Sequence, residues 1–369
     1  MRHLLSTLLV LAAAGHAAEY LVLTGAYTTG PVKGIYAFHF RTNNGKLSAS
    51  GVAVETPDPT FLVEHPNHRF VYAVNHREGT VGAFAVDFKH DRLVPLNRVS
   101  SRGEGPCHLA FDRTGRWLAV ANYDSGSLAI LPVGTDGKLG EAVAVDRHQG
   151  SSINPQQKSA HASGVAFSLD NRFLLLADLG LDKVFVYHFD VSHGAIAPDD
   201  PAFATEAPGA GPGRVAVHIS GQVIYVLNDL NSTITVYLYD APSGTLKPVQ
   251  TVTTLPATFV GSNAASAIAI STGGTLLYSS NVGNDTIALF SIDVNRLILT
   301  PIDHTPTLGQ SPREFAIDPT GQFLLAANQN SSTVEVFRMQ HMTGQLRPVG
   351  HPAIAPAPTD VLMIPVPAK

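Results

Sequence analysis

The chain has 369 residues, of which 44% are hydrophobic and 14% are charged, and its formal net charge is −5. This apolar content, together with 32 Gly and 25 Pro, excludes a disordered chain and predicts a globular protein rich in turns. The single cysteine, Cys107, excludes intrachain disulfides and cysteine-based metal clusters, and the lack of a Lys/Arg-rich run argues against nucleic acid as a partner.

The N-terminus has the features of a secretory signal peptide. Arg2 and His3 form a basic start, residues 4–14 are an apolar run too short to span a bilayer comfortably, and residues 15–17 (GHA) resemble a small-x-small cleavage site. We therefore expect a signal peptide over residues 1–17, a secreted or periplasmic mature chain, and no membrane contact after cleavage. A retained N-terminal anchor is the alternative.

One eight-residue phrase recurs along the rest of the chain, as in RFVYAVNH, RWLAVANY and RFLLLADL. Its seven copies begin 47 to 56 residues apart, at Glu19, Arg69, Arg116, Arg172, Gln222, Thr275 and Gln322. Each copy is a short apolar β-rich run that ends at Asn or Asp, except the first, which has Gly25 there. A repeat of this period is typical of β-propeller blades.

Each repeat carries the pattern of four strands. A short apolar run and a turn such as residues 112–115 (DRTG) precede the phrase, and an alternating segment such as residues 333–337 (TVEVF) and a weaker outer strand follow it. We predict an all-β fold, a single seven-bladed β-propeller over residues 19–365. A pair of β-sandwiches is the alternative, but it does not explain seven copies in phase.

The two ends of the chain are expected to share one blade. Residues 358–364 (PTDVLMI) read as an isolated innermost strand, and the chain from Glu19 onward supplies the other three strands of that blade. Pairing the two would close the ring and remove open sheet edges.

Polar side chains around the innermost strands are the candidates for a binding site, because propellers bind ligands at the mouth of the central channel. They lie in the loops before the first strand of each repeat and in the turns after the second. These candidates are His76, His108, Asn122, Tyr123, His161, Asp178, Arg214, Asn228, Asp229, Arg313, Asn328 and Gln329.

Several of these residues have a purely structural alternative. The repeated Asn or Asp can satisfy backbone donors of its own turn, and His108 can be a hydrogen-bonded structural histidine. Cys107 is better explained as a small buried hydrophobe than as a nucleophile. Arg313 is harder to explain in this way, since a buried guanidinium needs a carboxylate or an anionic ligand.

Four segments carry a resemblance to a known family. They are residues 105–112 (GPCHLAFD), 121–126 (ANYDSG), 177–182 (ADLGLD) and 312–321 (PREFAIDPTG). Together they resemble the seven-bladed propeller lactonases, which include 6-phosphogluconolactonase of bacteria and carboxy-muconate cyclising enzymes of fungi. The likeness covers nearly all of the mature chain.

The chain departs from the family's pattern at several positions. Where the family has Gly-Pro-Arg-His, this chain has Gly213 and Arg214 in place of the Arg and the His. Asp229 replaces a Glu, and Ser163-Gly164 replaces His-Ser, with His161 two residues earlier. Arg313 alone matches cleanly.

The resemblance implies hydrolysis of a sugar lactone or related cyclic ester, with no cofactor and no metal. Arg313 would anchor an anion, Asp229 and His161 would transfer protons, and Arg214 would be an auxiliary cation. His108, Asn122, Tyr123, Asp178, Asn228, Asn328 and Gln329 would contact the substrate, a lactone or sugar acid.

Two alternatives remain open: a non-catalytic propeller that binds a ligand or protein, and a muconate-type cyclase or isomerase. Because the chain is expected to be exported, we expect a substrate other than the cytosolic phosphorylated lactone.

Overall fold

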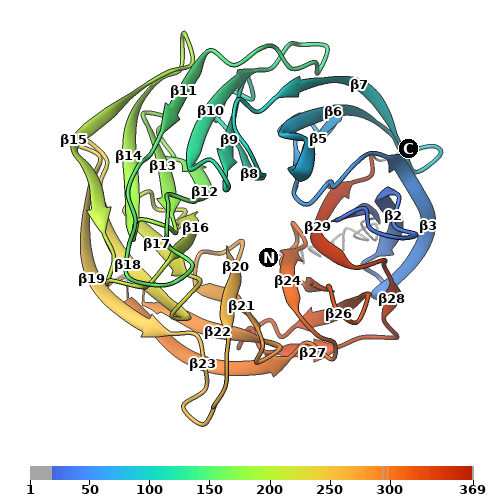
Figure 1. Cartoon of the computed structure of the whole chain (residues 1–369). Helices are drawn as coiled ribbons and strands as arrows, with labels where there is room; N and C mark the ends of the chain where they lie inside the picture. The colour runs from blue at the N-terminus through green and yellow to red at the C-terminus, as the bar shows by residue number, and fades with distance from the viewer. Residues whose placement is uncertain (1–18, 294, 297, 368–369) are drawn as a thin grey trace, which may run out of the picture.

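The computed structural model describes residues 19–293, 295–296 and 298–367, and the proposed signal peptide lies outside them. Seven antiparallel sheets surround a central channel (Figure 1). The predicted seven-bladed β-propeller is therefore confirmed. Within the described residues the helical structure is one short 3₁₀ turn, η1 (His76–Glu78), and no helix is long and apolar enough to cross a bilayer.

Each blade runs from an innermost strand at the channel to an outermost strand at the rim. In this order, one blade consists of β29 (Pro358–Pro365), β1 (Glu19–Ala26), β2 (Gly34–Arg41) and β3 (Lys46–Glu55). The next consists of β4 (Leu62–Glu64), β5 (Phe70–Asn75), β6 (Thr80–Asp87) and β7 (Arg92–Ser100). It is followed by β8 (Pro106–Phe111), β9 (Trp117–Asn122), β10 (Ser127–Pro132) and β11 (Ala144–Arg147), and then by β12 (Ala162–Phe167), β13 (Phe173–Asp178), β14 (Lys183–Asp190) and β15 (Ala195–Thr205).

The remaining three blades follow in chain order. They are β16 (Pro212–Val217), β17 (Val223–Asn228), β18 (Thr233–Asp240) and β19 (Thr245–Thr253), then β20 (Ala264–Ile270), β21 (Leu276–Val282), β22 (Thr286–Asp293) and β23 (Ile298–Pro306). The last has β24 (Pro312–Ile317), β25 (Phe323–Asn328), β26 (Thr333–Met339) and β27 (Leu346–Pro348), with β28 (Ala353–Ile354) also paired to β26.

The recurring phrase of the sequence forms the second strand of each blade. Every residue of β5, β9, β13, β17 and β25 is buried. These strands are sandwiched between neighbouring blades, so both of their faces are covered and the sequence reads as a continuous apolar run. The outermost strands, such as β15 and β19, are mostly exposed or half-buried.

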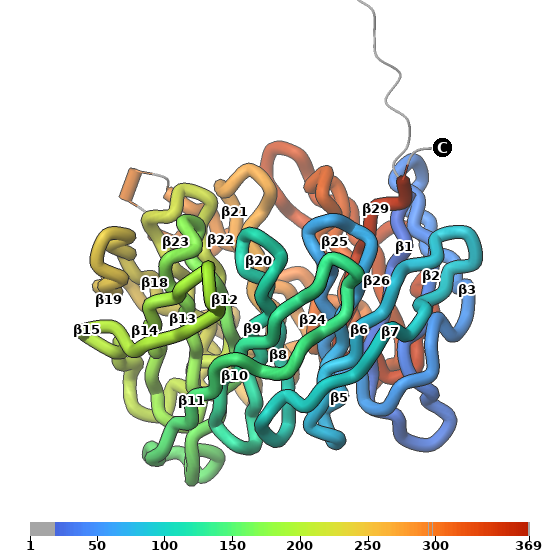
Figure 2. The backbone as a smooth tube through the Cα atoms, turned by 90° about the horizontal axis from the view of Figure 1, so that it is seen from above, coloured from blue at the N-terminus to red at the C-terminus, as the bar shows by residue number. Residues whose placement is uncertain are grey.

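The two ends of the chain close the ring, as predicted. β29 pairs antiparallel with β1, with Leu23 opposite Leu362 and Leu21 opposite Ile364. Figure 2 shows the red C-terminal strand beside the blue N-terminal blade. Leu21, Leu23 and Ile364 are fully buried in the cluster between this blade and the next.

The innermost strands share one irregularity that positions the site. In β8, β12, β16 and β24 the pairing skips one residue, namely Cys107, Ser163, Gly213 or Arg313. β29 skips Thr359 and β20 has two residues, Ser266 and Ala267, out of register. Such bulges leave a residue out of the ladder and re-aim its side chain. They recur at the same end of six of the seven inner strands, β4 being the exception, and therefore surround one mouth of the channel.

Ring closure predicts the effect of a C-terminal truncation. A chain that ends at Ala357 lacks β29, leaves the edge of β1 unpaired and uncovers Leu21 and Leu23. We expect aggregation and a lower Tm, measured by size-exclusion chromatography and circular dichroism. A control that ends at Pro367 keeps β29 and should behave as the full chain; equal Tm values for the two truncations would contradict the role of this strand.

Candidate active site in the central channel

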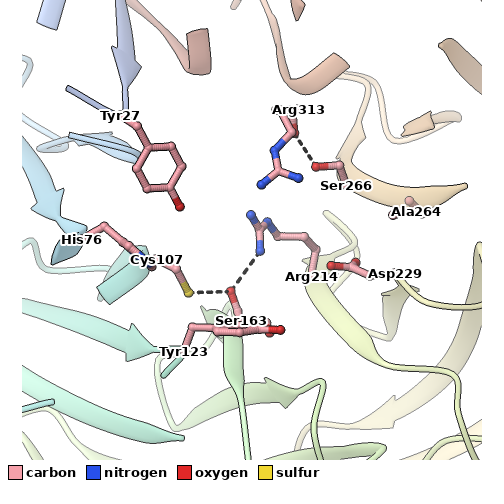
Figure 3. A pocket seen from close by; sticks show the side chains of 11 residues that line it. Tyr27, His76, Cys107, Tyr123, Ser163, Arg214, Asp229, Ala264, Ser266 and Arg313 are labelled. Atoms are coloured by element: carbon pink, nitrogen blue, oxygen red, sulfur yellow. Dashed lines mark hydrogen bonds between the residues drawn. The ribbon is translucent and has the colours of Figure 1, made fainter. Parts of the chain in front are cut away.

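A cavity of about 210 Å³ opens at the mouth of the channel where the bulges lie. Its walls come from all seven blades, and most of its side chains are polar (Figure 3). It is lined by Tyr27, His76, Cys107, Tyr123, Ser163, Arg214, Asp229, Ala264, Ala265, Ser266 and Arg313. Among the proposed catalytic residues, Arg214, Asp229 and Arg313 are therefore brought together.

Two guanidinium groups point into this cavity from adjacent positions (Figure 3). Arg214 donates from Nη1 to the carbonyl oxygens of Ser163 (2.9 Å) and Gly213 (3.1 Å), and its Nε is buried without a partner in the described residues. The backbone at the bulge of Arg313 is held by Ser266, whose hydroxyl donates to the Arg313 carbonyl (2.7 Å). Within the described chain, neither arginine forms an ion pair with a carboxylate within 4.0 Å, so both charges remain available to a ligand.

Asp229 supplies the carboxyl group of the cavity. Its backbone is fixed on both sides, because its N–H donates to Gly211 O (2.7 Å) and its carbonyl accepts from Ala265 N (3.1 Å). Its Oδ1 is buried and makes no hydrogen bond in the described structure. Burial raises the pKa of Asp229 to about 7, against the opposing effect of the Arg214 and Arg313 charges. The group can therefore gain or lose a proton near neutral pH.

The glycine at position 213 makes room for this carboxyl group. A Cβ built on Gly213 would lie 2.1 Å from Asp229 Oδ1 and 2.4 Å from Oδ2. Any side chain at this bulge would displace the carboxylate. Gly213, Arg214 and Asp229 thus form one arrangement, in which the cation comes from the residue after the bulge and the acid occupies the space beside it.

His161 lies outside the cavity, behind Tyr123. The two rings stack with centroids 4.4 Å apart and an interplanar angle of 16°, and His161 Nδ1 lies 3.0 Å from the Tyr123 carbonyl oxygen. Since a carbonyl only accepts, Nδ1 carries the proton. Tyr123 lines the cavity. Burial raises the pKa of its hydroxyl to about 12, so this hydroxyl is a neutral hydrogen-bond donor.

The candidate Asn residues of the turns, unlike Asp229, lie away from the cavity. Asn122 Nδ2 donates to Ser101 O (3.1 Å), Asn328 Nδ2 to Thr307 O (3.2 Å) and Asn228 Nδ2 to Thr235 Oγ1 (3.0 Å). These three contacts join the inner part of a blade to its own third strand or to the preceding blade. The Oδ1 atoms of all three amides are buried without a hydrogen-bond partner in the described structure, so these residues do not satisfy the backbone donors of their own turns as the structural alternative expects.

Asp178 and Gln329 are similarly engaged. Asp178 accepts the backbone N–H groups of His161 (2.8 Å) and Gly180 (3.0 Å) and pairs with His148 Nδ1 at 2.6 Å. The backbone N–H of Gln329 donates to Ser311 O (2.9 Å). Neither lines the cavity at the mouth.

Cys107 and His108 occupy successive levels of the channel. The Cys107 thiol lies 3.4 Å from Ala162 O, and burial raises its pKa to about 12, so the thiol is protonated and a poor nucleophile. His108 lines a second, deeper cavity of about 240 Å³, with Arg214, Glu314 and Asp360 among its other walls. Burial, followed by the Arg214 charge, holds the pKa of His108 well below its usual range.

Sequence reasoning missed several residues of the channel, among them Tyr27, Ser266, Glu314 and Asp360. Tyr27 directly follows β1, and its ring lies edge-on to the ring of His76, with centroids 5.5 Å apart. A signal for two of the others does exist in the sequence: Glu314 and Asp360 each stand two residues after a proline that begins an inner strand. In the described residues, no group of three or more His, Cys, Asp or Glu side chains is arranged to hold a metal ion.

Comparison with known proteins agrees with the seven-bladed propeller fold over nearly the whole chain. Residues 21–363 match the family model described as "Lactonase, 7-bladed beta-propeller". The chain is 29% identical to a 6-phosphogluconolactonase of Bacillus subtilis, with 93% of this chain and 98% of that protein covered. It is 33% identical to a 6-phosphogluconolactonase of Formosa agariphila, with 88% and 94% covered.

A solved structure is similar at the same level. The periplasmic gluconolactonase of Pseudomonas aeruginosa superimposes with a TM-score of 0.89 and is 32% identical, with 95% of this chain and 100% of that chain covered.

The raised pKa of Asp229 predicts how its replacement changes stability. The pKa is about 7 in the folded chain and about 4 in an unfolded one, so ionising this group destabilises the folded state as pH rises from 4 through 7. We expect Asp229→Asn to raise Tm by a few degrees at pH 8 and by much less at pH 4, measured by thermal unfolding.

Asp190→Asn is the matched control for this experiment. A hydrogen bond from His193 lowers the pKa of Asp190, so ionisation of this group favours the folded state and its loss should give no gain at pH 8. Equal changes for Asp229→Asn at both pH values would show that its pKa is not raised.

Proposed function

This chain belongs to the seven-bladed β-propeller lactonases, and we propose that it is a hydrolase that opens a sugar lactone or a related cyclic ester. The proposal depends most on one observation: the Asp229 carboxyl, with a pKa of about 7, faces the unpaired guanidinium groups of Arg214 and Arg313 in one cavity. A base that titrates near neutral pH beside two cations meets the needs of ester hydrolysis.

The reaction would begin with proton transfer to Asp229. The carboxylate takes a proton from a water molecule, and the water oxygen attacks the carbonyl carbon of the lactone. The electron pair of the C=O bond moves to the carbonyl oxygen, whose negative charge the Arg313 and Arg214 guanidinium groups stabilise. Both cations are present before the reaction begins, so little reorganisation is required.

Ring opening completes the cycle. The tetrahedral intermediate collapses, the bond between the carbonyl carbon and the ring oxygen breaks, and the ring oxygen receives the proton held by Asp229. The product is a hydroxy acid, and Asp229 is again a carboxylate. Tyr123 would donate a hydrogen bond to a substrate hydroxyl, and His161, stacked behind it, would hold the Tyr123 ring in position.

The proposed substrate is a lactone without phosphate. The cavity offers two guanidinium groups, and one of them lies close to the Asp229 carboxyl. Its positive charge is therefore modest for binding a phosphate dianion. We also propose export to the periplasm or the outside of the cell, based on the character of residues 1–17 and on the similarity to a periplasmic gluconolactonase.

The pH dependence and one arginine variant test hydrolysis. With Asp229 as base, kcat/KM for glucono-δ-lactone, followed by pH-stat above the spontaneous rate, should rise about tenfold per pH unit up to about pH 7 and then level off. Arg313→Ala should lower kcat/KM about 10²–10³-fold. Arg69→Ala, an exposed arginine that lies 5.5 Å over the Phe70 ring, should leave the rate unchanged.

One result would contradict the proposed hydrolysis. If no lactone in a panel is opened above the spontaneous rate, while the sugar acids still bind with an affinity that Arg313→Ala weakens, the chain is a binding propeller.

A glycine pair tests the geometry of the base. Gly213→Ala would drive a methyl group against the Asp229 carboxyl, whereas a Cβ at Gly273 meets nothing nearer than Thr275 Oγ1 at 3.9 Å. Neither glycine needs a left-handed backbone. We expect Gly213→Ala to lower kcat about 100-fold, since a misplacement of about 1 Å has this effect, and Gly273→Ala to leave kcat unchanged. Full activity of Gly213→Ala would argue against Asp229 as the base.

A further inference from the structure

Four inner strands begin with the same short pattern, a proline followed by any residue and then an ionisable one. The pattern appears as PCH in β8, PGR in β16, PRE in β24 and PTD in β29. In each strand the middle residue is the one that the pairing skips. The third residues, His108, Arg214, Glu314 and Asp360, all line the second cavity of about 240 Å³. The fold therefore builds a second ring of ionisable groups below the first.

The polar atoms of this lower ring are only partly satisfied by the protein. Glu314 Oε1 accepts the N–H of Phe315 (3.1 Å) and Asp360 Oδ2 accepts the N–H of Leu62 (2.6 Å). His108 Nδ1 accepts from Val165 N (3.3 Å), so its proton is on Nε2. Within the described chain, Arg214 Nε is buried without a hydrogen-bond partner. Polar atoms left in this state are available to a ligand.

The two carboxyl groups both have raised pKa values, so each binds a proton more readily than a free carboxyl does. Burial raises the pKa of Glu314 to about 7, and burial together with the Glu314 charge raises the pKa of Asp360 well above its usual range. The pair can consequently both donate and accept hydrogen bonds, while Arg214 and the neutral His108 donate.

This mixture of groups distinguishes among classes of ligand. An anion would meet two carboxyl groups, and a cation would meet the Arg214 guanidinium. A hydroxyl group both donates and accepts, so a polyhydroxylated ligand satisfies carboxyl, guanidinium and imidazole groups without adding charge to a buried site. Phe61, whose ring packs against the His108 ring with centroids 4.3 Å apart, and the buried Phe315 make part of the wall apolar.

The two cavities share Arg214 as a wall residue. A small cavity of about 80 Å³, with Thr60 and Thr359 in its wall, shares Arg214 and Arg313 with the upper cavity and Arg214 and Phe61 with the lower one. The upper cavity alone, at about 210 Å³, is smaller than the roughly 300–1,000 Å³ of most small-molecule sites. A ligand of usual size would occupy both levels.

We propose that the lower cavity binds a second sugar residue, so that the preferred substrate is a glycosylated aldonolactone whose lactone ring lies beside Asp229 and Arg313. This inference rests on the proposed lactone hydrolysis. It assigns Glu314, Asp360 and His108 to recognition of the glycosyl residue, and Arg214 to both levels.

The test compares one-residue and two-residue substrates on the full mature chain. The readout is the ratio of kcat/KM for cellobiono-δ-lactone to kcat/KM for glucono-δ-lactone. We expect this ratio to exceed one in the wild type and to fall about tenfold in Glu314→Gln, which loses the ionisable carboxyl. It should also fall in Ile268→Phe, which narrows the lower cavity without touching its charges. Glu335→Gln, a buried glutamate of β26 outside all three cavities, is the matched control and should leave the ratio unchanged.

Each outcome decides one of the two proposals. If glucono-δ-lactone is opened but the wild-type ratio does not exceed one, or the ratio is the same in every variant, the lower cavity is not a sugar site and hydrolysis stands.

If no lactone is opened, the proposed hydrolysis is wrong. Calorimetry with cellobionic and gluconic acids then tests separately whether the lower cavity binds a sugar residue. Tighter binding of cellobionic acid that Glu314→Gln weakens would retain it, and equal binding of the two acids would overturn it.

Discussion

The break in strand pairing near the start of six of the seven inner strands is the constraint on which the site depends. In a regular strand, side chains alternate between two faces, so only every second residue of an inner strand could face the channel. The bulges leave Cys107, Ser163, Gly213 and Arg313 unpaired and turn them toward the mouth. The residue that follows each bulge re-enters the ladder one level deeper. One irregularity, repeated around the ring, therefore produces two stacked levels of side chains from successive positions in the sequence.

The same arrangement places several ionisable groups in a confined channel, and the rest of the fold must offset their cost. Asp229 Oδ1 and Arg214 Nε are buried without partners in the described structure, and burial raises the pKa values of Asp229 and Glu314 to about 7. Each unpaired group destabilises the folded chain. Stability comes instead from the fully buried second strands, which pack between blades, and from the pairing of β29 with β1. Core and site are separate in the blade, so the channel can change its side chains without altering the core.

The parts of the fold that could be predicted are those that depend on apolar repetition. The buried second strands appear directly as seven copies of one phrase, and residues 358–364 read as an isolated strand because nothing near them supplies a partner. The functional site was harder to predict than the fold. Asp229, Arg214 and Arg313 were found because a turn residue and two cations stood out against apolar strands.

Asn122 and Asn328 stood out equally, yet their amides bond to Ser101 O and Thr307 O, carbonyls that follow the outermost strands of the preceding blade. A contact between blades leaves no local pattern. Glu314 and Asp360 were missed for a related reason, since alternation alone does not reveal a bulge that moves a charged side chain into the channel.

Arg214 connects the two levels, and the glycine that precedes it makes room for the Asp229 carboxyl. With a side chain at position 213, the Asp229 carboxyl would have no space, and with glycine there the guanidinium of the next residue lines the upper cavity beside it. That guanidinium also borders the lower cavity, where its charge opposes the raised pKa values of Glu314 and Asp360. A change at Arg214 would therefore alter the electrostatics of both levels at once, whereas Arg313 lines only the upper cavity and the small one that joins it to the lower level. The chemistry of the mouth and the selectivity of the channel are consequently coupled through one side chain, and neither can be redesigned without the other.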